Sequence, residues 1–212
     1  SIPSGYALYL RIDHGDYQDD VPDHLRPKIF YAIDTHLPKS WRRIRRIARR
    51  YDLVCCAQRA AAESLPNGAW VPLACDPDLH RADSGEQRWD VAFVGTDGGV
   101  PRKFYLQALR ERYARHFIGG APHTQLGTIY GRAKIGFNYS IRGDINMRIF
   151  EILCAGCLLM TNRLAHDELD RVGFHDRTHL VVYRHASDLF ALIEHYLAHD
   201  AQRQAIARHG QE

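Results

Sequence analysis

The sequence predicts an α/β chain with two doubly wound parallel sheets. Short apolar runs that end at Gly, Pro or Asp alternate with stretches of helical period, and this alternation is typical of strand–helix–strand units. The pattern lapses once, at about residues 76–88, where the sequence is polar and rich in turn residues. We therefore predict two Rossmann-like domains, residues 1–80 and 81–212, joined by a linker.

The first half contains four strand-like runs and two helical stretches. In chain order they are a strand at 6–12, a strand at 28–34, a helix at 39–51, a strand at 52–58, a helix at 59–65 and a strand at 69–74. These are too few strands for a closed doubly wound sheet, so we expect this domain to be incomplete. The start at a strand-like run without Met favours a fragment of a longer protein.

The second half carries about five strands with helical crossovers, enough for a complete small Rossmann-like domain. In order, we predict a strand at 89–95, a glycine loop at 96–101, a helix at 102–115, a strand at 116–120, a helix at 124–133, a strand at 134–140, a helix that ends at Gly156, a strand at 157–161, a short helix near Glu168, a strand at 179–183 and a two-segment helix at 187–209.

Composition excludes several classes of protein. Lys and Arg number 28 against 25 Asp and Glu, so a nucleic-acid role would need a local basic patch, and we expect no nucleic-acid partner. No run of eighteen apolar residues occurs, and the first residues lack the pattern of a signal peptide. We therefore expect a cytoplasmic location.

The five cysteines have no spacing typical of a small disulfide scaffold, which fits a reducing compartment. Cys154 and Cys157 form a C-x-x-C pair, but no second pair or histidine cluster completes a zinc motif. We therefore predict no metal site.

Ligands of open parallel sheets collect at the carboxyl ends of the strands, so polar residues directly after strands are the candidates for function. The first such group is Asp34, Thr35 and His36. An imidazole there can orient a bound hydroxyl or exchange a proton with it. The alternative is that Asp34 and Thr35 cap the next helix and that His36 is merely exposed.

The second group is the glycine loop. Gly95, Gly98 and Gly99 let a ligand approach the backbone, and Arg102 and Lys103 begin the next helix. Backbone N–H groups, a helix start and two cations suit a diphosphate. The loop has neither the G-x-G-x-x-G nor the Walker pattern, so a dinucleotide oxidoreductase and a P-loop NTPase are not supported.

The third group, Asn138, Ser140 and Arg142, follows a central strand. The helix after it carries Glu151 among apolar residues that leave almost no polar face. A carboxylate buried there costs several kcal/mol unless hydrogen bonds satisfy it. An internal ion pair with Arg148, three residues earlier, is the structural alternative to a ligand.

The stretch 41–51 places six arginines on one helical face and apolar residues on the other. Trp41, Ile44, Ala48 and Tyr51 form the apolar face, as expected for a surface helix packed on a sheet. Contact of the arginine face with an anionic membrane surface or an acidic polymer is the alternative to simple solvation.

Taken together, five segments resemble the bacterial glycosyltransferases of the GT-B fold. They match most closely the spore-maturation-protein or family 1-like branch, which is related to family 4. The segments, which follow the same order as in that branch, are "FYAIDTHL", "VPLACDPDLH", "DVAFVG", "RAKIGFNYSIRGDINMRIFEILCAGCLLMTNR" and "HLVVY". The resemblance runs from about Lys28 to Tyr183, nearly the whole chain.

The resemblance implies a role for individual residues. Glu151 would accept hydrogen bonds from the ribose hydroxyls of a nucleotide-sugar donor, and the helix start with Asn146 and Arg148 would face the diphosphate or the sugar. His36 would lie near the transferred sugar, with Asp34 beside it. The loop at Gly95 would line an interdomain cleft, and the remaining candidates for donor binding are Arg102, Lys103, Asn138 and Arg142.

One position departs from the family pattern. Retaining family 4 relatives carry a second acidic residue eight positions before the ribose-binding glutamate, and that position is Gly143 here, next to Asp144. Asp144 is therefore the candidate for the role of that carboxylate near the donor sugar.

The resemblance implies transfer of a sugar from a nucleoside diphosphate sugar, such as a UDP-sugar, to a hydroxyl of a glycan, lipid or protein. No metal and no further cofactor are expected, because no D-x-D motif stands in the strand-end loops. Two alternatives stay open: a non-catalytic nucleotide-sugar or glycan-binding module, and a binder of anionic polymers or membrane surfaces through the arginine-rich helix.

Overall fold

The structure, a computed structural model, describes residues 2–17, 20–82, 85–165 and 167–212. The chain divides into two compact units, Ser1–Leu73 and Ala74–Glu212, here called unit 1 and unit 2. Each unit has its own parallel sheet, which confirms the predicted α/β fold class. Within the described residues, no helix has both the length and the apolar character needed to cross a lipid bilayer.

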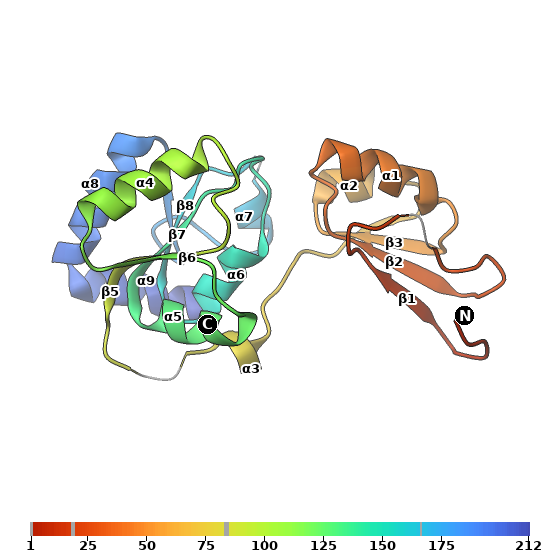
Figure 1. Cartoon of the computed structure of the whole chain (residues 1–212), viewed down its shortest axis with the longest axis horizontal. Coiled ribbons are helices and arrows are strands. Elements are labelled where there is room, and N and C mark those ends of the chain that lie inside the picture. Colours follow the sequence, from red (N-terminus) through yellow and green to blue (C-terminus); the bar gives the residue numbers. More distant parts are fainter. Residues whose placement is uncertain (1, 18–19, 83–84, 166) are drawn as a thin grey trace. The chain divides into compact units, whose positions relative to one another are not determined.

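Unit 1 is a parallel sheet in the order β1-β2-β3-β4. Figure 1 shows both of its helices on the same side of the sheet. The elements are β1 (Tyr9–Ile12), β2 (Lys28–Ala32), α1 (Pro38–Ala48), β3 (Leu53–Cys56), α2 (Arg59–Glu63) and β4 (Gly68–Trp70).

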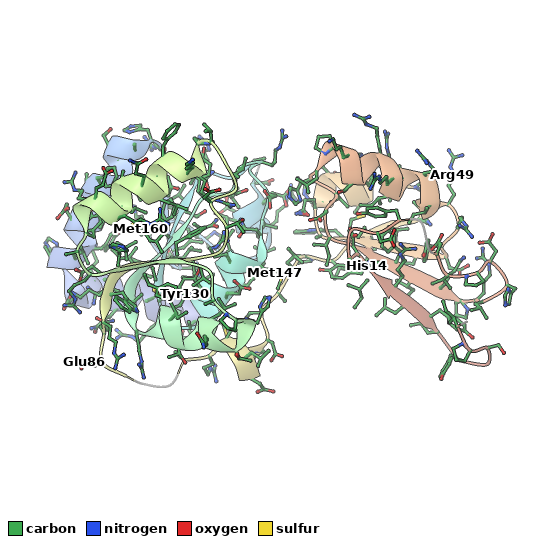
Figure 2. The ribbon with its side chains drawn as sticks, in the orientation of Figure 1. His14, Arg49, Glu86, Tyr130, Met147 and Met160 are labelled. Carbon is green, nitrogen blue, oxygen red and sulfur yellow. The ribbon has the colours of Figure 1, made fainter. Side chains whose placement is uncertain are left out.

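Helix α1 packs an apolar stripe on the sheet, as its helical period predicts. Ile44 and Ala48 are fully buried in one cluster with Phe30 and Val54. The arginines face outward, and the labelled Arg49 lies at the surface in Figure 2. On β1 the burial alternates, so Leu10 and Ile12 are exposed while their neighbours are buried. In the described residues, the helices of unit 1 cover only one face of its sheet.

Unit 2 is a parallel sheet in the order β6-β5-β7-β8-β9. Its short connections and helical crossovers are those of a complete Rossmann-like unit. The elements are α3 (Pro77–His80), β5 (Trp89–Val94), α4 (Arg102–Arg112), β6 (His116–Gly119), the 3₁₀ helix η1 (His123–Gln125), α5 (Leu126–Gly131), β7 (Ala133–Asn138), α6 (Met147–Cys154), β8 (Leu158–Asn162), α7 (Glu168–Arg171), β9 (Val181–Tyr183), α8 (Ala186–Ala198) and α9 (Asp200–Gln211).

Both faces of this sheet are buried. One face packs on α4 and α8 in a cluster that includes Leu106, Met160 and Ile193, and the other packs on α5 and α6 in a cluster with Tyr130 and Ile152. Met160 and Tyr130 lie inside unit 2 in Figure 2, whereas Glu86 lies at its margin. Apolar side chains on both faces explain why these strands read as continuous apolar runs.

The stretch that we predicted as a linker, 76–88, contains a short helix. Asp76 caps α3 by accepting a hydrogen bond from the Asp78 N–H, and Pro77 occupies the first turn. This helix packs on α5 and α6. The backbones of α3 and α5 approach so closely at Gly127 that a Cβ there would lie 2.8 Å from the His80 carbonyl oxygen. The unit boundary therefore falls at Leu73–Ala74, before α3, whereas we had predicted it after residue 80.

Candidate functional site

The candidate site of unit 2 lies where the sheet changes direction. From β5 the chain runs to β6 on one side and then returns to β7 on the other side. The loops after β5 and β7 therefore diverge at their carboxyl ends, which is where open α/β sheets bind ligands. Gly95 follows β5 directly, and Asn138 ends β7.

Arg148, in the first turn of α6, reaches across both strand ends. Its Nε donates to the Val94 carbonyl oxygen at 2.9 Å, and its Nη1 donates to Asn138 Oδ1 at 3.1 Å. Its guanidinium carbon lies 4.4 Å from the centre of the Phe93 ring. The alternative that Arg148 pairs with Glu151 is therefore wrong: in the described residues no ion pair joins them, because Arg148 is directed at the strand ends.

Asn138 is fully buried, and its amide orientation is fixed by its neighbours. Its Nδ2 donates to Thr161 Oγ1 at 2.9 Å, which turns Oδ1 toward Arg148. The Tyr183 hydroxyl donates to the Asn138 backbone oxygen at 2.9 Å. Asn138 thus holds the guanidinium of Arg148 in place, and both its amide oxygen and its amide nitrogen have protein partners.

Arg102 places a second guanidinium over the same Phe93 ring, at 5.6 Å from its centre. Its Nε donates to the Asp97 carbonyl oxygen and its Nη1 to the Tyr139 carbonyl oxygen. Burial lowers the pKa of Arg102, and the nearby charge of Arg148 lowers it further. Within the described part of the chain neither guanidinium pairs with a carboxylate, so the pair can accept an anion.

Gly95 and Gly98 make room for the arginine pair. Gly95 has φ +140°, and a Cβ there would lie 2.5 Å from Arg148 Nη2. Gly98 has φ +62°, and a Cβ there would overlap the Arg102 guanidinium. Both positions therefore require glycine for its backbone conformation and for its lack of a side chain.

The start of α6 is polar and lacks a side-chain cap. Asn146, the N-cap residue, makes no capping hydrogen bond, and its Oδ1 is buried with no partner among the described residues. Asp144 accepts a hydrogen bond from Ser140 Oγ at 2.6 Å. An N-terminus of this kind favours an anion through its N–H groups and its dipole.

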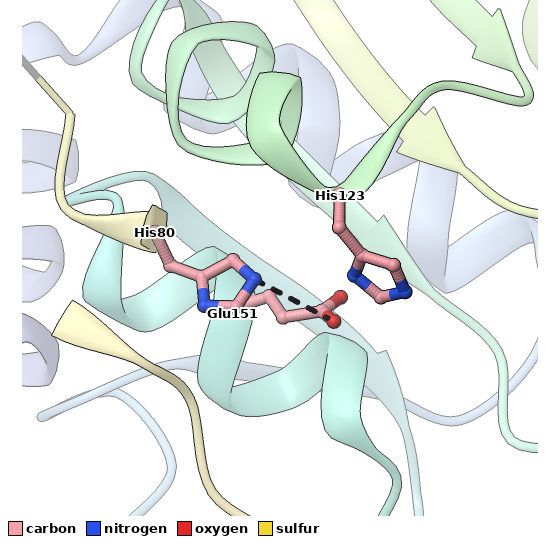
Figure 3. Close-up of side chains that lie close together, drawn as sticks. All are labelled: His80, His123 and Glu151. Atoms are coloured by element: carbon pink, nitrogen blue, oxygen red, sulfur yellow. Dashed lines mark ion pairs between the residues drawn. The ribbon is translucent and has the colours of Figure 1, made fainter. Parts of the chain in front are cut away.

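Glu151 lies one turn further along α6 and faces α3. Its side chain is buried, with 7% of the residue exposed. Glu151 makes no hydrogen bond within the described residues, and His80 Nε2 lies 4.0 Å from its Oε1, beyond hydrogen-bond distance. His123, from η1, brings a second imidazole to the same place, and the three ligand atoms lie within 4.8 Å of one another (Figure 3).

Asp34 and His36 lie in unit 1, in the turn between β2 and α1. The N-cap of α1 is Leu37, and no side chain caps the helix, so the alternative of an Asp34–Thr35 cap is wrong. Asp34 N donates to Asp13 Oδ2 at 3.2 Å. His36 is half-buried rather than exposed, and its Nδ1 is buried without a partner among the described residues.

The remaining two candidates lie outside the cluster. Arg142 and Lys103 are exposed, and neither side chain makes a hydrogen bond or an ion pair within the described residues.

A cavity of about 680 Å³ lies near α7 and β9, lined by Arg163, Asp167, Arg177 and other residues but by none of the predicted site residues. It has both acidic and basic walls, so charge alone favours no particular ligand.

Sequence reasoning missed His80 and His123. His80 stands in the polar stretch that we predicted as a linker, where an exposed histidine is the ordinary expectation. The start "DPD" is a helix N-terminus signal, with Asp as the cap and Pro in the first turn. That signal predicts α3, but it does not predict that α3 packs beside Glu151.

Solved structures with a similar fold are glycosyltransferases of GT-B type. HepE of Anabaena, solved with UDP-glucose, is 12% identical with a TM-score of 0.63, and the match covers 88% of this chain and 66% of HepE. TarM of S. aureus is 10% identical with a TM-score of 0.66, over 96% of this chain and 50% of TarM. An alpha-glucosyltransferase solved with UDP-glucose and DNA containing an abasic site is 11% identical with a TM-score of 0.59, over 89% of this chain and 68% of that protein.

These likenesses confirm the GT-B fold that the sequence predicts. The chain spans about two thirds of the length of HepE and half of the length of TarM. No protein of curated function matches the chain. The model of the family described as "Glycosyl transferase-like" matches residues 79–212, which include the arginine pair, α6 and Glu151. That match covers more than half of the chain, and the chain therefore belongs to the glycosyl transferase-like family.

Proposed function

We propose that unit 2 binds a nucleoside diphosphate sugar, most simply a UDP-sugar, and that the protein transfers the sugar to a hydroxyl of a glycan, lipid or protein. The observation that carries this proposal is Glu151, a residue 7% exposed whose carboxylate makes no hydrogen bond within the described residues. Its oxygens are not among the unpartnered side-chain atoms closed to solvent, so the hydroxyls of a ligand can reach them. The UDP-glucose in HepE and in the alpha-glucosyltransferase supports a ligand of this class.

The geometry divides the donor between two places on α6. The guanidinium groups of Arg102 and Arg148, with the N-terminus of the helix at Asn146, suit a diphosphate. One turn further, the carboxylate of Glu151 suits a diol, because a carboxylate accepts two hydroxyl hydrogen bonds. Diphosphate and ribose are adjacent in a nucleoside diphosphate, in agreement with the order of these groups along the helix.

In the reaction that we propose, the bond between the sugar C1 and the diphosphate oxygen breaks, and a bond from C1 to the acceptor oxygen forms. The acceptor hydroxyl gives up its proton, and the nucleoside diphosphate leaves with the bonding electron pair. Arg102 and Arg148 would stabilise the negative charge of the leaving diphosphate. His36, Asp34 and Asp144 are the proposed groups beside the transferred sugar, on the basis of the family resemblance.

We also propose hexosyl transfer in the cytoplasm without a metal or another cofactor. Two cations already face the diphosphate position, and these can neutralise charge in the place of a divalent ion. Donor binding measured with and without EDTA checks this point. Equal affinity is expected, and loss of binding in EDTA would show that a metal is required.

Thermal unfolding with a panel of nucleoside diphosphates tests the donor site. A ligand that binds only the native state stabilises it by about 2.7 kcal/mol at a hundredfold excess over Kd. The melting temperature rises as a result. We expect one nucleotide to stabilise the wild type and to have no effect on Glu151→Ala. Stabilisation of both proteins by the same amount would place the nucleotide elsewhere.

Hydrolysis of the bound donor separates a transferase from a binding module. A transferase with an accessible donor releases the nucleoside diphosphate slowly to water and faster when an acceptor is added. Binding without hydrolysis or transfer to any acceptor would favour the non-catalytic module.

A further inference from the structure

The ring of His80 is buried beside Glu151, and its orientation is set by the start of α3. The residue is 3% exposed. Its Nδ1 lies 3.0 Å from both the backbone nitrogen and the backbone oxygen of Asp76. The first step is to decide which ring nitrogen carries the proton, because that decides what Nε2 can bind.

The backbone of Asp76 answers this question. Its carbonyl oxygen already accepts hydrogen bonds from the N–H groups of Leu79, at 3.1 Å, and His80, at 2.8 Å. Its N–H group donates to His80 Nδ1, which is the acceptor recorded for it in the described residues. Because a backbone donor inside a protein requires an acceptor, Nδ1 is the acceptor nitrogen and Nε2 carries the proton.

Nε2–H is thus a buried donor that points at a carboxylate it does not reach. It has no hydrogen-bond partner among the described residues. The distance from Nε2 to Glu151 Oε1 is 4.0 Å, too long for a direct hydrogen bond. One hydroxyl oxygen about 2.9 Å from Nε2 and about 2.7 Å from Oε1 can accept from His80 and donate to Glu151. A hydroxyl is both donor and acceptor, and therefore matches this pair.

We propose that His80 is a donor-recognition residue, whose Nε2–H binds the same ribose hydroxyl that donates its proton to Glu151. This inference rests on the proposed function, since it assumes that a nucleoside diphosphate occupies the site. It adds a substrate class: the site selects ribonucleotides over deoxyribonucleotides. A deoxy analogue leaves both the Nε2–H of His80 and the Glu151 carboxylate unsatisfied. A site that hydrogen-bonds a hydroxyl discriminates strongly against an analogue that lacks this hydroxyl.

A zinc ion held by His80, His123 and Glu151 is the competing occupant, since the three ligand atoms lie within 4.8 Å of one another. Two features disfavour it. Zinc at ordinary bond lengths from both Nε2 and Oε1 would subtend about 150° between them, far from a tetrahedral angle. Zinc also needs Nε2 without its proton, which would leave the Asp76 N–H without its acceptor.

Two variants of His80 separate the functions of its ring nitrogens. In His80→Asn the side-chain oxygen takes the place of Nδ1 and accepts from Asp76, but the donor at Nε2 is lost. In His80→Gln the amide nitrogen takes the place of Nε2 and retains that donor. His209→Asn, at an exposed position on α9, is the matched control.

The measurement is calorimetric titration of these proteins with UDP, 2′-deoxy-UDP and 3′-deoxy-UDP. For the wild type, we expect at least one deoxy analogue to bind about tenfold or more weakly than UDP. His80→Asn should weaken UDP about tenfold but change the affinity for that analogue less than twofold, because the lost partner is already absent. His80→Gln and His209→Asn should bind UDP nearly as the wild type does.

Four results overturn the inference. Unchanged affinity of His80→Asn for UDP, with normal binding by the wild type, removes the role of His80 and leaves the proposed function intact. Failure of the wild type to bind any nucleoside diphosphate would contradict both the role of His80 and the proposed function. Stoichiometric Zn²⁺ binding that is lost in both His80→Asn and Glu151→Gln would show a metal site instead. If His80→Asn does not fold, equal binding of UDP and both deoxy analogues by the wild type overturns the inference alone.

Discussion

Lys28 of unit 1 and Glu151 of unit 2 are both buried charges, and they differ in what surrounds them. Lys28 is fully buried, and its Nζ donates at 2.9 Å to the Val21 carbonyl oxygen and at 2.9 Å to Asp23 Oδ1. The same Nζ lies 5.1 Å from the centre of the Tyr51 ring. Within the described residues Glu151 makes no hydrogen bond: His80 Nε2 lies 4.0 Å away, and His123 is the other imidazole nearby. A buried ammonium with all its partners is structural, whereas a carboxylate without them fits the donor site that we propose.

Another buried charge of unit 2 does have hydrogen-bond partners. Arg203 of α9 is 1% exposed, and its Nη1 donates to the Tyr196 carbonyl oxygen at 3.1 Å and pairs with Asp200, while its Nη2 donates to Gln87. Unit 2 therefore satisfies a structural charge as completely as unit 1 does. The missing donors at Glu151 are a property of that place on α6, which strengthens the case for a bound hydroxyl there.

The largest effect should come from Lys28→Ala. Removing the side chain leaves a cavity and an unpaired buried carbonyl oxygen, so we expect unit 1 to lose about 3 kcal/mol of unfolding free energy. Denaturant unfolding in a Trp89→Phe background checks it, because the remaining Trp41 and Trp70 belong to unit 1. Lys39→Ala, an exposed position on α1, should change the value by less than about 0.5 kcal/mol. A loss below about 1 kcal/mol would show that Lys28 is not a structural charge, and the comparison with Glu151 would fail.

Glu151→Gln should act on binding rather than on folding. The amide cannot accept as strongly from a diol, so nucleotide affinity should fall by about 2 kcal/mol, roughly 30-fold. Without ligand, the unfolding free energy should change by less than about 1 kcal/mol or should rise, because a buried charge without donors is removed. Calorimetry and denaturant unfolding measure the two quantities, with the exposed Glu86→Gln as control. A large loss of stability without ligand would make Glu151 a structural charge like Lys28.

Arg148→Lys should sharpen the comparison by separating diphosphate from nucleoside. The lysine keeps the charge but loses the planar fork that bonds Val94 and Asn138 and that we propose to bind the diphosphate. We expect UDP affinity to fall about tenfold while uridine affinity stays unchanged. Titration with both ligands checks this, and Arg208→Lys, at an exposed position on α9, is the control. An equal loss for both ligands would mean that Arg148 only supports the fold.

The smallest effect is expected from the exposed arginines of α1. Arg42→Ala and Arg49→Ala remove solvated charges, so unfolding free energy should change by less than about 0.5 kcal/mol and nucleotide affinity by less than about twofold. The same measurements as above suffice. A steep salt dependence of nucleotide binding that disappears in these variants would favour the anionic-polymer binder over the donor site in unit 2.

The periodicity of apolar residues was enough to predict most of the helices and strands and which of their faces are buried. The apolar residues around Glu151 predicted its burial, because a helix with almost no polar face must be covered on most sides. The apolar runs at 89–95 and 134–140 predicted buried strands of a parallel sheet, and β5 and β7 form there. That these two strands pair was not predicted from the sequence. The stripe of Ile44 and Ala48 predicted the packed face of α1.

Tertiary structure decided which partner each polar side chain has. Spacing allowed Arg148 to pair with Glu151, but the strand ends of β5 and β7 supplied better acceptors for its guanidinium. The stretch read as a linker contains α3, and Gly127 allows this helix to pack closely on α5. This packing buries His80 beside Glu151. Local sequence fixes which face of an element is buried, because periodicity is a property of one segment. Partners come from segments far apart in the chain, and only the packed fold brings those together.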